Sequence, residues 1–358
     1  MIKTSYYQDL TKMNTFGMKV KARCFVEYDS VADLVDIEFE ELPRPVLHIG
    51  GGSNLLFTDD FKGTVLHSKI NFIEILDAIS SKVLVSVGAG VVFDDFCDWA
   101  AKEGLWGVEN LSYIPGEVGA SAVQNIGAYG VEVKDVIKTV YCYDTVDEEF
   151  VNFDVEDLEY GYRDSAFKDP EIRGRYIVTH VVFALSRTPQ PMLDYGHLKE
   201  AVEAAGSELT PSLIRKAIIK IRKEKLPEPS VMGSAGSFFK NPIIGKDHFE
   251  SIVAAAKSAY GPDYKVPHYI VDAQPGHCQE QGDVTIPMVK VPAAWLIEQC
   301  GWKGKRSGNA AVYDKQPLVI VNYTGEAYPE EIIGLERRII ASVKAKFDIE
   351  LHPEVDHI

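Results

Sequence analysis

Two glycine-rich segments are the first candidates for binding a ligand. The segment IGGGSNLLF, residues 49–57, directly follows a short apolar run that is typical of a strand. Consecutive glycines let a backbone adopt positive φ and present successive N–H groups to an anion such as phosphate. The segment lacks the third glycine of a dinucleotide fingerprint, and the chain has no Gly-Lys followed by Ser or Thr, as a P-loop requires. An ordinary glycine turn is the alternative interpretation.

The second segment, YIPGEVGASAVQNIGAYG at residues 113–130, is too apolar for a surface linker. Its small residues allow a backbone to approach a flat ligand closely, which favours a bound cofactor. Close packing of two loops, or of a helix against a sheet, would need the same residue types. The presence of two such loops in one chain favours the ligand.

Two further segments carry side chains that could act on a substrate. GYRDSAFK, residues 161–168, offers an arginine fork suited to a carboxylate or phosphate, with a tyrosine hydroxyl beside it. GSAGSFFKNP, residues 233–242, holds Ser234 and Ser237 on a glycine turn, where a hydroxyl can donate a proton. It is not a GxSxG nucleophile elbow. A surface ion pair in the first segment and local serine caps in the second are the structural alternatives.

Length and composition restrict the class of protein. The 358 residues suffice for two or three domains, and 46% hydrophobic with 25% charged residues is typical of a globular chain. The net charge of −16 would repel nucleic acid. The chain starts without the apolar core of a signal peptide, and no apolar window reaches the ~20 residues of a membrane span. We therefore expect a cytoplasmic protein with neither nucleic-acid nor membrane partners.

The cysteines indicate no disulfide framework and no metal site. They are odd in number and far apart, and they show neither CxxC nor zinc-type Cys/His spacing. We expect reduced thiols at Cys24, Cys97, Cys142, Cys278 and Cys300.

The candidate segments must be positioned by mixed α and β elements. The first part predicts a helix over residues 31–42, strands in PVLHIG, GTVLH and KVLVSVGAG, and an amphipathic helix in FDDFCDWAAKEG. Residues 136–186 are rich in β-type runs and predict a mostly antiparallel sheet.

The last part of the chain is richer in helical patterns. TPSLIRKAIIKIRKEKLPEP predicts a helix that begins at an N-cap, Thr210, and ends before a proline. Its six basic residues between positions 215 and 225 suit either a solvated helix face or a substrate with phosphates. Further helices are expected around the strand PLVIVNY, at residues 246–257, 292–300 and 329–346.

Taken together, these segments resemble the type I UDP-N-acetylenolpyruvoylglucosamine reductase (MurB) family. Any one of these sequence strings is weak evidence for the family, but the set in this order is specific and extends over nearly the whole chain. The strings are NTFG at 14, GGGSNLLF at 50, ENLSYIPGEVGASAVQNIGAYGVE at 109, YGYRDSAFK at 160, KLPEP at 225, GSAGSFFKNP at 233, AAWLIEQCGWKG at 293 and HPEV at 352.

The resemblance implies an α+β fold. It would combine a two-part FAD-binding unit of the vanillyl-alcohol oxidase/p-cresol methylhydroxylase type with a smaller C-terminal α/β substrate-binding domain. We expect the FAD-binding subdomains at residues 1–70 and 71–210 and the substrate-binding domain at residues 211–353, with the extreme C-terminus packed back on the first subdomain.

The same resemblance implies non-covalently bound FAD that NADPH reduces. The FAD pyrophosphate is expected against residues 50–54 and 115–121, with Gly127 and Tyr129 at the flavin-side wall. The full expected cofactor set is Ile49, Gly50, Gly51, Gly52, Ser53, Asn54, Pro115, Gly116, Gly119, Ala120, Ser121, Gly127 and Tyr129.

The family reduces the enolpyruvyl ether of UDP-N-acetylglucosamine to a D-lactyl ether, which gives UDP-N-acetylmuramate for peptidoglycan. A hydride adds to the methylene carbon, and the charge that builds on the carboxylate-bearing carbon needs a nearby cation and acid. Arg163 and Glu354 match the family's residues that polarise the substrate carboxylate and stabilise the enol, and Ser237 matches the family's proton donor.

The stretch LDYGHL, with Tyr195, resembles the tyrosine loop that closes over the substrate in type I members. Tyr195, Lys225 and Asn241 match residues that hold the UDP pyrophosphate, and Tyr162 and Lys303 complete the expected substrate-binding set. We expect the enzyme to act as a monomer.

Three features depart from the family's pattern. The connection over residues 262–287 is longer than usual and has no assigned role, Asn309 stands where a glycine is more usual, and His352 stands where an acidic residue is common.

Two other functions were weighed. An FAD-linked oxidase on the same scaffold is disfavoured by the ordered C-terminal strings KLPEP, GSAGSFFKNP and HPEV. A catalytically silent sugar-nucleotide binding protein is disfavoured because Arg163, Ser237 and Glu354 are all present.

Overall fold

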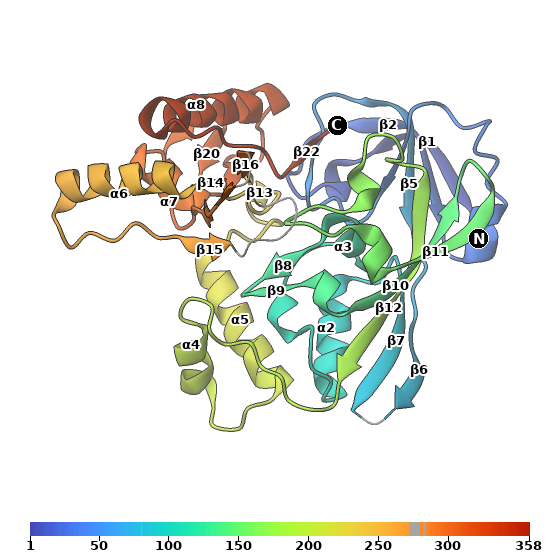
Figure 1. The fold of residues 1–358 in the computed structure, drawn as a ribbon. Helices are drawn as coiled ribbons and strands as arrows, with labels where there is room; N and C mark the ends of the chain where they lie inside the picture. Colours follow the sequence, from blue (N-terminus) through green and yellow to red (C-terminus); the bar gives the residue numbers. More distant parts are fainter. Residues whose placement is uncertain (80, 272–278, 282–283) are drawn as a thin grey trace.

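The first sheet contains the strand that leads into the first glycine loop. The computed structural model describes residues 1–79, 81–271, 279–281 and 284–358. In this sheet, β1 (Lys3–Asp9) pairs antiparallel with β2 (Lys21–Tyr28), which runs parallel to β5 (Phe61–Ser68) (Figure 1). Strand β5 also runs parallel to β3 (Val46–Ile49). The first glycine loop leaves the end of β3, as the sequence predicts.

The helix expected over residues 31–42 is wrong beyond its first turn, because α1 spans only Val31–Val35. Ser30 caps it by accepting from the N–H of Asp33. Leu34, Ile37 and Phe39 all lie buried in one cluster. Residues 37 and 39 are two positions apart and would face different directions on a helix, so burying both requires the chain to leave the helix.

A second, fully antiparallel sheet follows in the order β11-β10-β12-β7-β6. This confirms the antiparallel sheet expected over residues 136–186. Its strands are β6 (Ile73–Ile79), β7 (Lys82–Gly88), β10 (Ile137–Asp144), β11 (Glu149–Asp154) and β12 (Tyr176–Ser186).

Helices α2 (Phe93–Lys102) and α3 (Val118–Gln124) bury apolar residues in the same core as this sheet. Phe96 of α2 packs on Phe183 of β12 with ring centroids 4.7 Å apart. A small hairpin, β8 (Gly127–Ala128) and β9 (Val131–Glu132), follows α3. The second glycine segment therefore runs from the loop before α3, through that helix, into this hairpin.

In its described residues, the C-terminal unit combines short antiparallel strands with three helices. One sheet has the order β13-β21-β20-β19 and another β14-β18-β15, and β16 pairs with β17. The strands are β13 (Gly233–Ser234), β14 (Ile243–Gly245), β15 (Tyr269–Val271), β16 (Gln279–Gln281), β17 (Val284–Ile286), β18 (Met288–Lys290), β19 (Arg306–Ser307), β20 (Ala310–Val312) and β21 (Ile320–Asn322). The helices are α6 (Lys246–Tyr260), α7 (Ala293–Gln299) and α8 (Pro329–Phe347), close to their expected positions.

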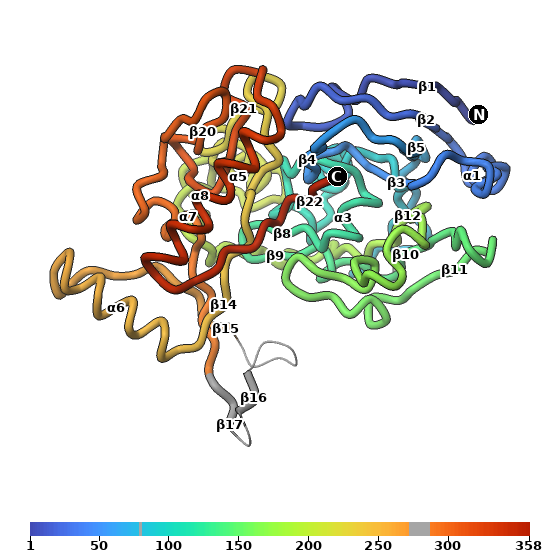
Figure 2. Tube along the Cα trace, turned by 90° about the horizontal axis from the view of Figure 1, so that it is seen from above, coloured from blue at the N-terminus to red at the C-terminus, as the bar shows by residue number. Residues whose placement is uncertain are grey.

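The chain returns to the first subdomain at its end. Strand β22 (Asp356–His357) pairs in parallel with β4 (Leu55–Leu56), which directly follows the first glycine loop (Figure 2). One apolar core joins both ends of the chain, since it includes Phe16 and Phe57 together with Phe238 and Ile339. This return brings the HPEV segment next to the glycine loop.

The boundary between the FAD-binding unit and the C-terminal domain, expected at residue 211, remains a proposal. Helix α5 (Pro211–Lys225) begins at its expected N-cap, Thr210, whose hydroxyl accepts from the N–H of Leu213. Its buried Ile214 and Ile218 pack with Leu198 of α4 (Leu198–Ala205) and with Trp106. Because α5 packs on the α2 and α4 side, we favour a boundary after α5 over the expected one at residue 211.

No helix in the described ranges combines the length and apolarity needed to cross a bilayer. Cys24, Cys97, Cys142 and Cys300 are free thiols, and Cys278 lies outside the described residues.

Candidate active site

The two glycine segments lie directly against each other. A Cβ atom added to Gly51 would lie 3.3 Å from the Cα of Gly116, and one added to Gly50 would lie 3.0 Å from the Cβ of Ala120. The hydroxyl of Ser53 donates to the carbonyl of Pro115 at 3.0 Å. Larger side chains at these glycines would push the two loops apart.

The first loop also has unused backbone donors. Gly52 has φ +61°, and a Cβ there would lie 1.9 Å from the carbonyl oxygen of Met13, so only glycine fits. Within the described residues, the N–H groups of Gly51, Gly52 and Ser53 have no hydrogen-bond acceptor. Backbone donors of this kind need a partner, and an anion can supply it.

Other members of the expected cofactor set have structural contacts of their own. Ile49 is buried at the end of β3, so only its backbone can face a ligand. The Ser121 hydroxyl donates to the carbonyl of Val118, and a Cβ on Gly119 would lie 2.9 Å from that of Ala89. Asn54 donates its side-chain amide to the carbonyl of Glu354 at 3.0 Å, which ties the first loop to the HPEV segment.

Arg163 is held by three hydrogen bonds. Its Nε donates to Oε1 of Glu354 at 2.9 Å, and its two terminal nitrogens donate to the carbonyls of Gly127 and Asn125 at 2.6 and 3.3 Å. A Cβ on Gly127 would lie 2.8 Å from Nη1, so glycine is required there. Arg163 itself has φ +57°, a strained conformation that persists where surrounding contacts fix it.

Glu354 lies beside the segment that carries Ser237. Its N–H donates to the carbonyl of Phe238 at 2.8 Å, and the backbones of Phe239 and Pro353 form an isolated antiparallel β-bridge. Burial raises the pKa of the Glu354 carboxyl, and Arg163 partly offsets that rise. Ser237 follows Gly236 with φ +67°, and its side chain is exposed. The backbone pairing therefore brings Ser237, Glu354 and Arg163 together.

Tyr162 and Asn241 are also joined. The Asn241 amide donates to the Tyr162 hydroxyl at 3.1 Å and accepts from the N–H of Ala293 at 2.9 Å. The ammonium of Lys290 lies 4.6 Å from the centre of the Tyr162 ring. Burial raises the pKa of Tyr162 and lowers that of Lys290.

Tyr195 belongs to an aromatic cluster next to this group. Its ring stacks on Tyr269 with centroids 5.6 Å apart, and the Tyr269 hydroxyl donates to that of Tyr195 at 3.1 Å. Tyr129 packs edge-on against Tyr195 at 6.2 Å. A Cβ on Gly130 would lie 3.7 Å from the Cβ of Tyr195. The expected tyrosine loop thus contacts the end of the second glycine segment.

The two expected lysines are less closely integrated. Lys225 is exposed at the last turn of α5. Lys303 forms an exposed ion pair with Glu298 at 2.8 Å, and no contact among the described residues links it to Arg163 or Tyr162. The structure therefore brings most of the expected residues together but leaves Lys303 apart.

Comparison with known proteins identifies the family. A model of the UDP-N-acetylenolpyruvoylglucosamine reductase C-terminal domain matches residues 228–358, and a model of an FAD-binding domain matches residues 22–153. The chain is 49% identical over 350 residues to the UDP-N-acetylenolpyruvoylglucosamine reductase of Bacteroides fragilis, with 98% of both chains covered. It is 42% identical over 354 residues to that of Porphyromonas gingivalis, covering 98% and 97% of the two chains. The chain belongs to the UDP-N-acetylenolpyruvoylglucosamine reductase family.

A solved reductase of this family, from Thermus caldophilus, has the same fold. It aligns with 100% of this chain and 98% of its own, at a TM-score of 0.64 and 23% identity. The FAD-binding domain fits the geometry described above, because two opposed glycine loops with free backbone N–H groups can surround a pyrophosphate. The expected fold, with an FAD-binding domain and a reductase C-terminal domain, is confirmed.

Two departures from the reductase pattern have local explanations. Asn309 donates its N–H to Glu331 at 2.9 Å, and the Glu331 carboxylate also accepts from the N–H of Tyr328 at the start of α8. His352 contributes its backbone carbonyl, which accepts from Lys240, while its side chain is exposed. The side-chain type at position 352 is therefore free to vary. The longer connection is described only in part, since residues 272–278 and 282–283 lie outside the described ranges.

Several residues near the reductase site carry no motif that would have revealed them. Tyr269 and Lys290 lie on the paired strands β15 and β18, and Asn125 and Glu132 surround Arg163. Arg222 donates to the carbonyl of Tyr113 at 3.1 Å, and burial lowers the pKa of its guanidinium. The basic pattern of α5 was the one signal that pointed to Arg222.

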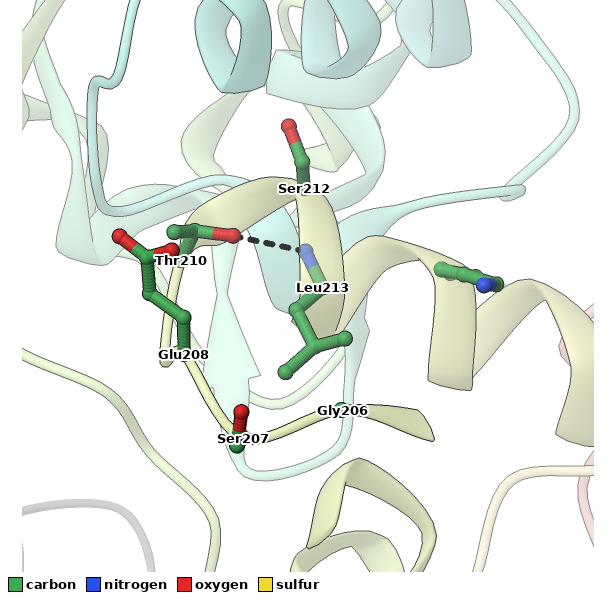
Figure 3. A pocket seen from close by; sticks show the side chains of 7 residues that line it. Gly206, Ser207, Glu208, Thr210, Ser212 and Leu213 are labelled. Atoms are coloured by element: carbon green, nitrogen blue, oxygen red, sulfur yellow. Dashed lines mark hydrogen bonds between the residues drawn. The ribbon is translucent and has the colours of Figure 1, made fainter. Parts of the chain in front are cut away.

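A separate pocket lies at the start of α5 (Figure 3). It is lined by Gly206, Ser207, Glu208, Thr210, Ser212, Leu213 and Lys216, and it includes the capping bond from Leu213 to Thr210. It shares no residue with the site described above.

Proposed function

We infer that this protein is an NADPH-dependent, FAD-containing reductase that converts UDP-N-acetylenolpyruvoylglucosamine to UDP-N-acetylmuramate for peptidoglycan synthesis. The observation that carries this function is 49% identity over 98% of both chains to a reductase of that name. The convergence of Arg163, Glu354 and the Ser237 segment supports it. When bound, FAD supplies hydride transfer between NADPH and the enolpyruvyl group.

Arg163 and Glu354 act on the substrate carboxylate in this proposal. The guanidinium has a planar fork of donors that can hold a carboxylate and oppose the negative charge that develops beside it. Its bond to Glu354 and its two bonds to backbone carbonyls support this role, because they fix the guanidinium before substrate arrives. Preorganised charge of this kind stabilises a transition state without further reorganisation.

Ser237 donates the proton that completes the reduction. Its side chain is exposed, and the neighbouring Gly236 and Phe238 fix the turn that carries it. A serine hydroxyl is a weak acid, so the reaction must generate a strongly basic carbon next to it. The N–H of Lys240 donates to the carbonyl of His352 and the N–H of Glu354 donates to that of Phe238, so the segments that carry Ser237 and Glu354 keep a fixed register.

The UDP part of the substrate is held by Tyr162, Tyr195, Lys225, Asn241 and Lys303 in this proposal. The bond between Asn241 and Tyr162 supports the placement of these two at one wall. Tyr195 sits in an aromatic cluster with Tyr269, and opening of this stacked pair would free both hydroxyls for the pyrophosphate. Lys303 would have to leave its ion pair with Glu298 to take part.

The proposal extends to a cytoplasmic monomer, because NADPH and UDP-linked sugars are cytoplasmic metabolites and every proposed site residue comes from one chain. Analytical ultracentrifugation tests the oligomeric state, with a single species near 39.8 kDa expected.

The direct test of the function is spectroscopic. Purified protein should be yellow, its flavin absorbance should bleach anaerobically with NADPH, and the absorbance should return on adding the enolpyruvyl substrate. A colourless protein after reconstitution with FAD, or a flavin that the substrate does not reoxidise, would contradict the proposed function.

A further inference from the structure

A buried asparagine joins the end of the second glycine segment to the chain that leads into the tyrosine loop. The side-chain nitrogen of Asn110 donates to the carbonyl of Tyr129 at 2.9 Å and to the carbonyl of Met192 at 2.8 Å. Asn110 is 1% exposed, and its side-chain oxygen has no hydrogen-bond partner among the described residues. The reverse orientation of the amide would point this oxygen at two carbonyl acceptors. The contacts therefore require the two N–H donors of an amide.

Asn110 itself sits on a fixed base. It lies in the 3-10 turn Glu109–Leu111, and Leu111 is fully buried in the core that the second sheet shares with α2 and α3. Beside it, the Ser112 hydroxyl donates to the carbonyl of Glu109 at 2.7 Å. The position of the amide is therefore set by the FAD-binding unit.

The first partner of Asn110 is a turn with positive backbone angles. Tyr129 and Gly130 connect β8 to β9 and have φ +49° and +82°, both positive as the central residues of a type I′ hairpin turn require. Glycine adopts such angles readily, whereas a tyrosine is strained there and needs surrounding contacts to hold it. The bond from Asn110 to the Tyr129 carbonyl is one such contact.

The second partner belongs to a segment with few other hydrogen bonds. After β12, the sequence PQPM at residues 189–192 leads into LDYGHL, and Pro189 and Pro191 have no N–H to donate. Among the described residues, the bond from Asn110 to Met192 is the only hydrogen bond that residues 189–194 form. Leu193 packs in the apolar cluster of α4 and α5, but apolar packing is non-directional. The bond from Asn110 therefore fixes the backbone at the start of the tyrosine loop.

We propose that Asn110 is a positioning residue for substrate binding: its amide fixes Met192 relative to Tyr129 and thereby places the Tyr195 hydroxyl for the pyrophosphate of the UDP-linked substrate. The inference rests on the proposed function, in which Tyr195 holds that pyrophosphate. Tyr195 lies three residues beyond Met192, and its ring packs edge-on against that of Tyr129 at 6.2 Å. One amide thus binds both the chain that carries Tyr195 and the turn whose ring contacts Tyr195.

Loss of the two N–H donors should leave the tyrosine loop in its binding position in only a fraction of the molecules. The apparent affinity for substrate falls in proportion to that fraction. Within the described ranges, the residues proposed for the chemistry, Arg163, Glu354 and Ser237, are not hydrogen-bond partners of this amide. The maximal rate of the reaction should therefore change little.

The test compares Asn110→Leu with the wild-type holoenzyme in anaerobic stopped-flow reoxidation of the reduced flavin by substrate. Leucine keeps a branched side chain of similar shape and has no N–H donor. The substrate concentration at half-maximal rate should rise about tenfold, the range for loss of one or two neutral hydrogen bonds. The limiting rate should stay within about threefold of wild type, as for a change in binding alone. An unchanged half-maximal concentration would overturn the proposal.

A double-mutant cycle with Tyr195→Phe separates positioning of the tyrosine loop from a general loss of stability. If Asn110 acts through Tyr195, removing the Tyr195 hydroxyl costs less binding once Asn110 has been changed. The rise in half-maximal concentration in the double variant should fall short of the product of the two single rises by about threefold or more. Two rises that simply multiply would show that the residues act independently and would overturn the proposal.

Thr64→Val is the matched control. Thr64 is fully buried on β5, and its hydroxyl donates to the carbonyl of Pro43 at 2.8 Å, so valine removes a buried donor to a backbone carbonyl in the first sheet. This variant should lose stability and keep the wild-type half-maximal concentration. An equal rise in Thr64→Val would assign the effect at Asn110 to lost stability and overturn its role. If Asn110→Leu does not fold, Asn110→Ser, whose side chain is too short to reach both carbonyls, decides by the same criteria.

Failure of this inference is distinct from failure of the proposed function. A wild-type flavin that the substrate does not reoxidise contradicts the function itself. Normal reoxidation in the wild type, with the wild-type half-maximal concentration in Asn110→Leu, overturns the role of Asn110 alone. A wild-type half-maximal concentration in Tyr195→Phe overturns it too, because Asn110 would then have no residue through which to act.

Discussion

Nε of Arg163 donates a 2.9 Å hydrogen bond to Oε1 of Glu354, a residue 191 positions later in the chain. The two side chains are 18% and 16% exposed, so water screens the pair only in part. The bond joins the segment between β11 and β12 to residues just before β22, the strand that pairs with β4 after the first glycine loop. The proposed catalytic group therefore depends on the middle of the chain folding together with its C-terminal end.

The same bond predicts a pH dependence. Burial raises the pKa of Glu354, so this carboxyl becomes protonated at a higher pH than the ordinary value of about 4.3. Protonation removes the charge that holds Arg163. Flavin reoxidation by substrate should therefore slow as pH falls through the raised pKa of Glu354, and it should recover above it.

Glu354→Gln should remove this acid limb while lowering the rate at every pH. Stopped-flow reoxidation between pH 4.5 and pH 8 checks the prediction. If reoxidation in Glu354→Gln still slows at low pH as in the wild type, the group whose protonation slows the reaction is not Glu354.

Gly51→Val should abolish FAD binding. A Cβ at this position already lies 3.3 Å from Gly116, and the two methyl groups of valine would separate the loops. Gly334→Val on α8 is the matched control, because a Cβ there meets nothing within 4 Å. The ratio of flavin to protein absorbance should fall close to zero in the first variant and stay near wild type in the second. Full flavin occupancy in Gly51→Val would refute the loop assignment.

Tyr195→Phe should weaken binding of the UDP-linked substrate and leave flavin reduction by NADPH largely intact. Its hydroxyl accepts from that of Tyr269, and in the proposed function it holds the substrate pyrophosphate and takes no part in hydride transfer. Tyr260→Phe, which removes a hydroxyl bonded to Gln299, serves as control. Rates of the two half-reactions as a function of substrate and NADPH concentration check this. An equal loss of rate in both half-reactions would contradict a role of Tyr195 that is confined to binding the UDP-linked substrate.

Asn241→Ala should misplace Tyr162 and lower stability. It leaves the Tyr162 hydroxyl and the N–H of Ala293 without their partner. An unsatisfied, partly buried group costs about 1 to 3 kcal/mol. Urea unfolding of the holoenzyme should show a loss in that range, together with a higher KM for the UDP-linked substrate. Unchanged KM with reduced stability would limit Asn241 to a structural role.

Local signals in the sequence predicted much of the fold. The cap and proline of α5, the β-type runs of the second sheet and the helices of the C-terminal unit lie where their patterns place them. The helix over residues 31–42 failed because burial of Ile37 and Phe39 in one cluster prevailed over helix-like spacing. The strand expected over PLVIVNY is shorter in the structure, where β21 spans only Ile320–Asn322.

The site was predictable only in part, because its contacts join distant segments. The glycine content of each loop indicated a ligand, but their mutual contact depends on packing between residues such as Gly51 and Gly116. The family resemblance assigned Arg163 and Glu354 to one site, but neither it nor any local pattern predicted the hydrogen bond between them. Tyr269 and Lys290 were missed because a single aromatic residue and a single lysine carry no specific spacing.

Separate measurement of the two half-reactions in Ser237→Ala tests the central claim most directly. Ser237 directly precedes Phe238, whose carbonyl accepts from the N–H of Glu354, and in the proposed reaction the Ser237 proton is needed only after the flavin has been reduced. Anaerobic stopped-flow absorbance should show bleaching by NADPH at close to the wild-type rate. Reoxidation by substrate should slow by ~10² or more, the range for loss of a positioned acid, and Ser237→Cys should recover part of that loss. Reoxidation of Ser237→Ala at the wild-type rate would contradict the account and leave Glu354 or water as the proton source.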